Sequence, residues 1–130
     1  MADRSPLIVA GAVDAALAVG LGAFAAHGLK DRLDATALAV FETGARYQMY
    51  HALAIVLCGT LVARYPAAQP AGWIFQLGIV LFSGSLYVMG LTGIRSLGLI
   101  TPFGGFAMLL GWAFLALAGR RLATATAPSA

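Results

Sequence analysis

Four long apolar stretches are the feature of this sequence that most limits how it can fold. They cover residues 7–26, 47–63, 72–92 and 103–119, and Asp14 is the only residue with a formal charge inside them. About 20 apolar residues in a helix cross the roughly 30 Å hydrocarbon core of a bilayer, and helices satisfy their own backbone groups there. We therefore expect an all-α, polytopic membrane protein with four transmembrane helices in an up-down-up-down bundle.

Composition supports a membrane location. Hydrophobic residues make up 61% of the chain and charged residues 10%, whereas soluble domains carry about 45 to 50% apolar and about 25% charged residues. At 130 residues the chain has room for one domain, which we place at residues 1–122, followed by a flexible tail at 123–130. The lone cysteine, Cys58, cannot form an internal disulfide and is expected to pack as a small hydrophobe.

The second stretch is short, and we expect its helix to begin upstream of the membrane. Asp34 or Thr36 can cap a helix start there, and apolar residues recur every three or four positions up to Ala45. A bend is expected near Gly44. For the first stretch a secretory signal peptide is the alternative interpretation, because Ala23-Phe24-Ala25 resembles a cleavage site.

Basic residues do not decide the orientation. If the spans alternate, four basic residues fall on each side of the membrane: Arg4, Arg64, Arg120 and Arg121 against Lys30, Arg32, Arg46 and Arg95. The positive-inside rule then favours neither side. We favour a bacterial inner membrane location with both termini cytoplasmic, and the tie leaves insertion in both orientations open. Basic residues beside apolar spans suit lipid headgroups rather than nucleic acid.

Small residues predict how the helices associate. Close approach of backbones and hydrogen bonds hold helices together in lipid, because lipid tails are as apolar as leucine. We expect three groups of small residues to face inward: Ala12, Ala16 and Gly20; Ala107 and Gly111; and Ser83, Gly84 and Ser85. Part of this surface can also serve a subunit interface, so we predict a homo-oligomer in the lipid bilayer.

A cluster of polar residues is the main candidate site. It consists of His27 at the end of the first span and of Glu42, Arg46, Tyr47, Tyr50 and His51, which succeed one another at about one helical turn. Polar groups near hydrocarbon are costly unless paired, so they suggest a function by default. Three interpretations stay open: structural hydrogen bonding, a transport or small-molecule binding site, and an intramembrane catalytic site.

Further polar residues form a secondary set of candidates. They are Asp14, Ser83, Ser85, Tyr87 and Thr101. Asp14 is either a hydrogen-bonded structural acid or part of a proton path. The two histidines lack the spacing of a metal site, and no motif indicates a catalytic nucleophile or a cofactor.

Four motifs in a fixed order resemble a known family. The motifs are Gly22-Ala-Phe-Ala-Ala-His27-Gly-Leu, Phe41-Glu-Thr-Gly-Ala-Arg46-Tyr-Gln-Met-Tyr-His51-Ala-Leu, Phe82-Ser-Gly-Ser-Leu-Tyr87 and Ile100-Thr-Pro-Phe-Gly-Gly105, followed by Gly111-Trp112. Over residues 7–121 the chain is similar to the YgdD family of small bacterial inner-membrane proteins, which has eukaryotic relatives. The resemblance implies four spans and a membrane location, and it implies no reaction, substrate or cofactor.

The sequence therefore predicts a membrane protein whose biochemical function is unknown. The favoured role is a small oligomeric scaffold or accessory subunit. A transporter or channel subunit and an intramembrane enzyme that uses the polar cluster are the alternatives.

Overall fold

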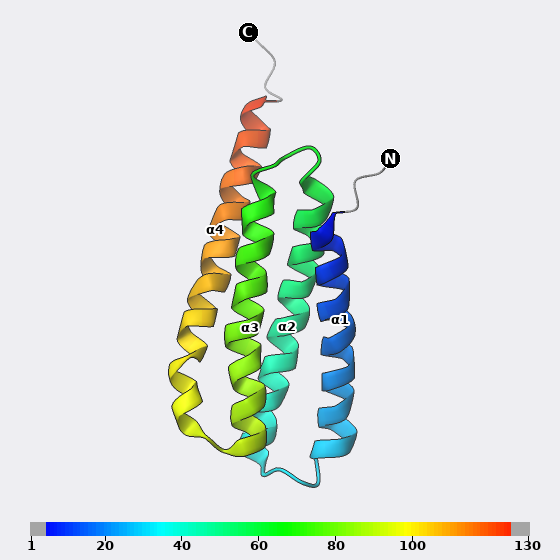
Figure 1. Ribbon diagram of the computed structural model, residues 1–130, viewed down its shortest axis with the longest axis vertical. Coiled ribbons are helices and arrows are strands. Elements are labelled where there is room, and N and C mark those ends of the chain that lie inside the picture. Colours follow the sequence, from blue (N-terminus) through cyan, green and yellow to red (C-terminus); the bar gives the residue numbers. More distant parts are fainter. Residues whose placement is uncertain (1–4, 126–130) are drawn as a thin grey trace.

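The computed structural model describes residues 5–125, and the side chains of residues 5–120. It contains four long helices and two short ones (Figure 1): α1 (Pro6–Phe24), a π-helical turn η1 (Ala25–Leu29), α2 (Ala35–Leu61), α3 (Ala68–Thr92), a 3-10 turn η2 (Arg95–Leu99) and α4 (Thr101–Ala125). No strand occurs within these residues, so the predicted all-α class is confirmed. The predicted tail is helical as far as Ala125, and its last residues, 126–130, lie outside the described part of the chain.

The four long helices lie in sequence order and alternate in direction. Helix α1 packs on α2, α2 on α3, and α3 on α4. Within the described residues α1 and α4 share no packed interface, so they form opposite edges of the row. Because the number of long helices is even, α1 begins and α4 ends at the same end of the molecule (Figure 1).

Local sequence signals explain where the helices begin and end. Pro6 is the first residue of α1, where the missing N–H costs no hydrogen bond. Asp34 is the N-cap of α2, and its carboxylate accepts a hydrogen bond from the Ala37 N–H at 2.8 Å. Gly93 ends α3 with a φ of 72°, a left-handed conformation that favours glycine.

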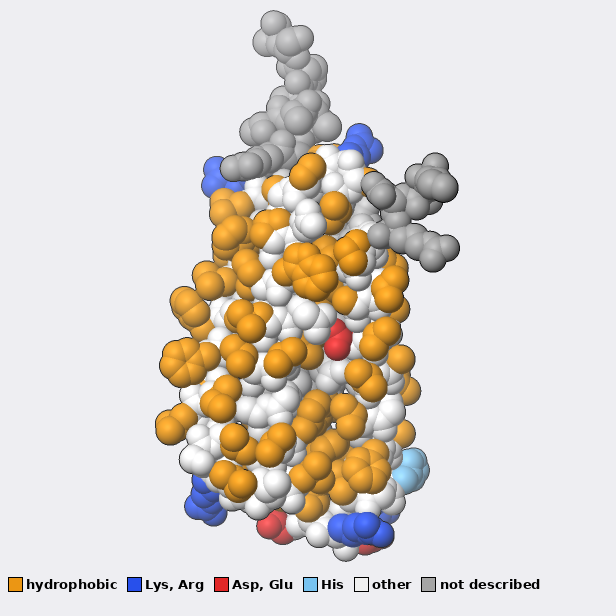
Figure 2. Space-filling view, in the orientation of Figure 1, with side chains coloured by type: hydrophobic (Ala, Val, Ile, Leu, Met, Phe, Trp, Pro, Cys, Tyr) orange, Lys and Arg blue, Asp and Glu red, His pale blue; other side chains and the backbone are white. Residues whose placement is uncertain are grey.

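Three segments are long and apolar enough to cross a membrane: Pro6–Leu29, Ala68–Thr92 and Arg95–Arg120. Helix α2, with 27 residues, is also long enough to cross a membrane. It is not among these three segments because its polar side chains lower its mean hydropathy. It is antiparallel to both of its neighbours and joins the end of α1 to the start of α3, so it crosses with them. Figure 2 shows apolar side chains over the middle of the visible face and basic side chains toward both ends.

Helix α2 is longer than the predicted span at 47–63. It is one uninterrupted α-helix from Ala35 to Leu61, and Gly44 lies within it. The upstream residues that we expected to precede the membrane therefore belong to the same continuous helix as the span. Residues 42 and 46 consequently lie inside the bundle's length rather than beyond its end.

Glycines allow the helices to approach closely. A Cβ on Gly11 would lie 2.7 Å from the Ala52 carbonyl oxygen, and a Cβ on Gly78 would lie 3.2 Å from the Gly104 carbonyl oxygen. Ala107, Gly111, Ser83 and Ser85 are buried, in agreement with the prediction, whereas Gly84 does not face a neighbouring helix, because a Cβ there would meet no atom within 4 Å.

The prediction that the small-residue row of α1 faces inward is wrong. Ala12, Ala16 and Gly20 are exposed, and a Cβ on Gly20 would meet no atom within 4 Å. The buried residues of α1 are instead Leu7, Gly11, Asp14 and Ala18. Both rows have the spacing of one helix face, and only the second contains the glycine that fits against the α2 backbone.

Two apolar clusters and a polar layer between them make up the interior. Near the end where α1 begins, Leu7, Ile55, Cys58, Phe75 and Met108 belong to one buried cluster, so Cys58 packs as a hydrophobe. A smaller cluster near the opposite end consists of Ala25, Leu29 and Phe41. Between the two clusters lie buried polar side chains, which form the candidate site: Asp14, Gln48, His51, Ser83 and Ser85.

Candidate functional site

His51 is buried and joins α2 to α4. Its Nδ1 lies 2.7 Å from the Tyr47 carbonyl oxygen, and the Trp112 Nε1–H donates to its Nε2 at 3.1 Å. The imidazole also packs against Phe75, with ring centroids 5.6 Å apart. A carbonyl can only accept and an indole can only donate, so these two bonds assign His51 as the neutral tautomer that carries its hydrogen on Nδ1.

This arrangement limits the chemistry of His51. Both ring nitrogens already have partners inside the chain, so neither offers a lone pair to a metal or to a substrate proton. Within the described residues no three His, Cys, Asp or Glu side chains gather where they could hold a metal ion. His51 therefore acts as a bridge between helices in this structure.

Gln48 is the centre of a second set of interhelical bonds. Its Nε2 donates to the Asp14 backbone oxygen on α1 at 2.9 Å, and its Oε1 accepts from the Tyr87 hydroxyl on α3 at 2.7 Å. Gln48 is 4% exposed, so water does not compete for these bonds. One side chain thus links three helices.

The serines of α3 complete the polar layer. Ser83 donates to the Gly44 carbonyl oxygen of α2 at 2.7 Å. Ser85 donates to the Phe82 carbonyl oxygen of its own helix at 2.9 Å, and its oxygen lies 2.7 Å from the Thr101 hydroxyl of α4. Because the single Ser85 proton points to Phe82, Thr101 supplies the hydrogen of the second bond.

Asp14 and Gln76 each leave one oxygen without a donor. Asp14 Oδ2 and Gln76 Oε1 are both buried and accept no hydrogen bond from the described part of the protein. The two side chains nevertheless lie side by side, on α1 and α3. A buried acceptor without a donor costs about 1 to 3 kcal/mol, more if it is charged. A single donor placed between these two oxygens would remove most of that cost.

Replacing Asp14 by Asn is expected to keep the fold and to raise the free energy of unfolding by up to about 1 kcal/mol. The amide brings N–H donors to the position of an oxygen that lacks one, and Gln76 Oε1 can accept from them. Thermal unfolding in detergent, followed by circular dichroism, measures the change. Asp14→Leu is the control without a donor: it leaves Gln76 Oε1 without a partner and should therefore be less stable than Asp14→Asn. A large loss of stability in Asp14→Asn would contradict the unpartnered oxygens seen here.

The remaining members of the predicted cluster lie on the outside of the molecule. Glu42, Arg46 and Tyr50 are exposed, and Tyr50 is 54% exposed. Although their i,i+4 spacing allows an ion pair, Glu42 and Arg46 do not form one in the described structure. A charged side chain at the centre of a membrane helix costs about 2.5 to 3.5 kcal/mol on insertion scales. This exposed face therefore needs an explanation different from that of the buried layer.

The structure places His27 far from His51. It lies in η1 at the end of α1 and is exposed. Gly11 packs against Ala52, so His27 is sixteen residues further along α1, or roughly 24 Å from the level of His51. The predicted group of six thus separates into a buried histidine, an exposed polar face on α2 and a distant histidine.

Sequence reasoning missed three participants in the buried layer: Gln48, Gln76 and Trp112. The two glutamines bond or contact Asp14, and Trp112 is the partner of His51. A signal was present, because an amide side chain in the middle of an apolar span requires a partner just as an ionisable one does.

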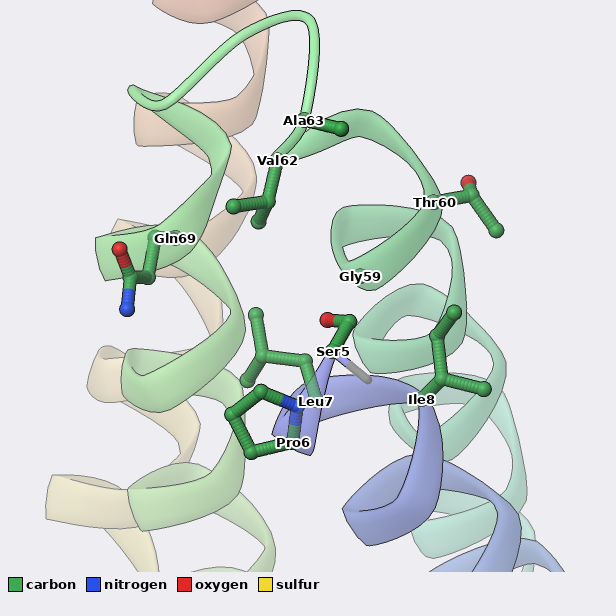
Figure 3. Close-up of a pocket in the computed structure, with 9 residues that line it drawn as sticks. All are labelled: Ser5, Pro6, Leu7, Ile8, Gly59, Thr60, Val62, Ala63 and Gln69. Atoms are coloured by element: carbon green, nitrogen blue, oxygen red, sulfur yellow. The ribbon is translucent and has the colours of Figure 1, made fainter. Parts of the chain in front are cut away.

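Two cavities lie at the ends of the bundle. One of about 370 Å³ is lined by the start of α1, the end of α2 and Gln69 of α3, and Figure 3 shows Leu7 and Val62 pointing into the space between the helices. The other, of about 650 Å³, lies at the opposite end between the starts of α2 and η2 and the end of α3, next to Arg95. Neither cavity is lined by a residue of the buried polar layer.

These features define a class: a small polytopic α-helical membrane protein whose buried polar residues connect its helices. Residues 21–105 match the model of the family described as "Protein of unknown function (DUF423)". The chain belongs to this family, for which no specific function is named.

Its relatives are also membrane proteins. The chain is 46% identical over 114 residues to the UPF0382 membrane protein YwdK of Bacillus subtilis, covering 85% of this chain and 93% of that protein. It is 44% identical over 117 residues to a UPF0382 membrane protein of Staphylococcus epidermidis, covering 89% and 96%. No solved structure matches the chain.

Proposed function

We propose that this protein is a small oligomeric scaffold or accessory subunit of the bacterial inner membrane. The observation that carries the proposal is the use of the buried polar side chains. His51, Ser83 and Tyr87 each form a hydrogen bond to another helix, and the second ring nitrogen of His51 bonds to the Tyr47 carbonyl oxygen of its own helix. Groups engaged in this way stabilise a fixed arrangement and are not available to a substrate. The resemblance to YgdD proteins supports the same bacterial membrane.

The proposal includes an orientation with both termini in the cytoplasm. Arg46 lies within α2 and therefore does not count as a residue flanking a span. The end that carries the termini then has four basic residues, and the opposite end has three, namely Lys30, Arg32 and Arg95. The excess favours cytoplasmic termini under the positive-inside rule. Cytoplasmic and periplasmic reporters fused to the C-terminus test it, and signals from both would indicate dual insertion.

A transporter or channel subunit is the second candidate. It is favoured by Glu42 and Arg46, two charged residues that are exposed within the length of α2. In lipid, such residues often mark an ion or substrate pathway. Measurements of stability and of flux separate the two candidates.

Replacing His51 by Ala is expected to lower the free energy of unfolding by about 2 to 4 kcal/mol, because it opens a cavity beside Phe75 and leaves the Trp112 N–H without an acceptor. His27→Ala is the matched control: His27 is exposed, so its removal should change stability by less than about 0.5 kcal/mol. Thermal unfolding in detergent measures both values. A smaller loss for His51 than for His27 would contradict the bridging role.

Flux tests the function itself. Purified protein is reconstituted into vesicles loaded with a pH-sensitive dye and potassium, and proton and potassium leakage are compared with protein-free vesicles. A scaffold adds no leakage, and Glu42→Gln changes nothing. Leakage that the wild type adds and Glu42→Gln abolishes would replace the scaffold by the transport candidate.

A further inference from the structure

Helix α2 presents one exposed stripe along its length. Residues Glu42, Arg46, Tyr50, Leu53 and Leu57 recur every three or four positions and are all exposed. Leu53 and Leu57 suit lipid. The half of the stripe nearer the start of α2 carries an acid, a base and a phenol. We call Glu42, Arg46 and Tyr50, together with the neighbouring Tyr47, the polar face.

The polar face lies at the depth of the hydrocarbon. Helix α2 has 27 residues and is therefore roughly 40 Å long, about 10 Å longer than the hydrocarbon core. Arg46 is the twelfth residue of α2 and lies roughly 16 to 18 Å from its start, within about 4 Å of its midpoint. Glu42 lies one helical turn closer than Arg46 to the start of α2. Both side chains would therefore face lipid tails if the protein were a monomer.

The side chains of the polar face have no polar partner within the described part of the chain. Glu42 and Arg46 make neither an ion pair nor a side-chain hydrogen bond there. The hydroxyls of Tyr47 and Tyr50 are likewise not hydrogen-bonded, and the two rings lie 5.9 Å apart. Ionisable residues inside membranes almost always face protein or a water-filled cavity and pair there. Neither of the cavities at the ends of the bundle is lined by these residues.

We propose that the polar face is the contact between two parallel copies of this chain, with Glu42 of each copy paired with Arg46 of the partner subunit. The proposal rests on the proposed oligomeric scaffold and locates its interface. An acid and a base one turn apart on the same stripe form a self-complementary surface, as a two-fold interface requires. Both ion pairs then form at once, removed from lipid.

Depth favours the parallel arrangement over the antiparallel one. A two-fold axis in the membrane plane exchanges residues at equal distances from the midpoint of α2, which is position 48. Glu42 would then lie at the level of position 54, next to the partner's Leu53, and it would find no base. In the parallel arrangement Glu42 and Arg46 of the partner subunit differ by about one turn, roughly 6 Å, which an arginine side chain can reach.

The tyrosines fit the same contact. Tyr47 is 39% exposed and packs on Phe82 with ring centroids 4.9 Å apart, so its ring is held in place. Tyrosine and arginine are enriched among the few residues that carry most of the binding energy of protein interfaces. The exposed Tyr50 extends the polar face toward the leucines of the stripe.

Charge reversal tests the proposal. The full chain is fused at its C-terminus to donor or acceptor fluorescent proteins and reconstituted into vesicles of phosphatidylethanolamine and phosphatidylglycerol, where energy transfer reports association. Glu42→Arg alone and Arg46→Glu alone each place like charges opposite one another, so each should weaken self-association roughly tenfold or more. Arg95→Glu, a reversal in η2 outside the polar face, should leave it unchanged.

Mixing the two variants is the decisive measurement. Glu42→Arg and Arg46→Glu copies together restore both pairs, but only between chains, so their mixture should associate within about threefold of the wild type. A pair within one chain cannot be restored by mixing. Circular dichroism and gel filtration of each variant show whether it is folded. If a charge-reversal variant does not fold, the milder Glu42→Gln and Arg46→Gln variants replace it in the test.

The outcomes separate this inference from the proposed function. A mixture that fails to associate, or single variants that associate like the wild type, overturns the polar face as the interface while an oligomeric scaffold still stands. A wild type that stays monomeric overturns both. Energy transfer typical of C-termini on opposite sides of the membrane replaces the parallel arrangement by the antiparallel one.

Discussion

Replacing Gly104 by Ala is expected to separate α4 from α3 and to lower the free energy of unfolding by about 3 kcal/mol. A Cβ at this position would overlap the backbone nitrogen of Phe82 and lie 2.7 Å from its Cα. A backbone cannot rotate away as a side chain can, so the helices must move apart. Helix α4 is sensitive to this change because it contacts the bundle through a narrow stripe of small residues.

Gly105→Ala is the matched control. Position 105 is adjacent on the same helix, and its Cβ would lie 3.7 Å from the Phe82 ring, an ordinary contact. Thermal unfolding in detergent should show a large shift for Gly104→Ala and almost none for Gly105→Ala. Trp112 fluorescence provides a second signal, because separation of α4 breaks the bond to His51. Equal shifts for the two variants would show that the close approach is absent.

Replacing Gln48 by Leu is expected to cost about 2 to 3 kcal/mol of unfolding free energy. The change removes the donor to the Asp14 backbone oxygen and leaves the Tyr87 hydroxyl without an acceptor. A half-buried hydroxyl without a partner is the larger part of the loss, since an orphaned group costs more than a hydrogen bond contributes. Chemical unfolding in mixed micelles measures the loss.

The Tyr87→Phe variant shows whether this reasoning is correct. Added to Gln48→Leu, it removes the orphaned hydroxyl, so the double variant should be less destabilised than the sum of the two single variants. Simple additivity would mean that Gln48 and Tyr87 do not act as a pair. An unchanged stability in Gln48→Leu would contradict the link between three helices.

The polar cluster could be predicted only in part. His51, Ser83 and Tyr87 were recognisable because a polar side chain within an apolar span needs a partner, and each has one in the structure. Their partners were not recognisable. Trp112 is 61 positions from His51, and only the antiparallel packing of α2, α3 and α4 brings the two together.

The same helical spacing misled the grouping of Glu42 and Arg46 with His51. Spacings of three and four residues place side chains on one side of a helix, and residues 42, 46 and 50 share one exposed side of α2. His51 is nine residues from Glu42, and at 3.6 residues per turn this places it on the opposite, buried side of the helix. The sequence of α2 by itself does not show which side of the helix packs against its neighbours.

The sequence alone determined that this is a helical membrane protein that crosses the bilayer four times, because each stretch can bond its own backbone within lipid and the breaks between stretches are local. It also determined that polar groups lie at membrane depth. The tertiary structure decided which faces turn inward. Leu7, Gly11 and Ala18 are buried, whereas Ala12, Ala16 and Gly20 are exposed. Lipid and protein interior are both apolar, so hydropathy does not distinguish these rows, and only the fit between helices does.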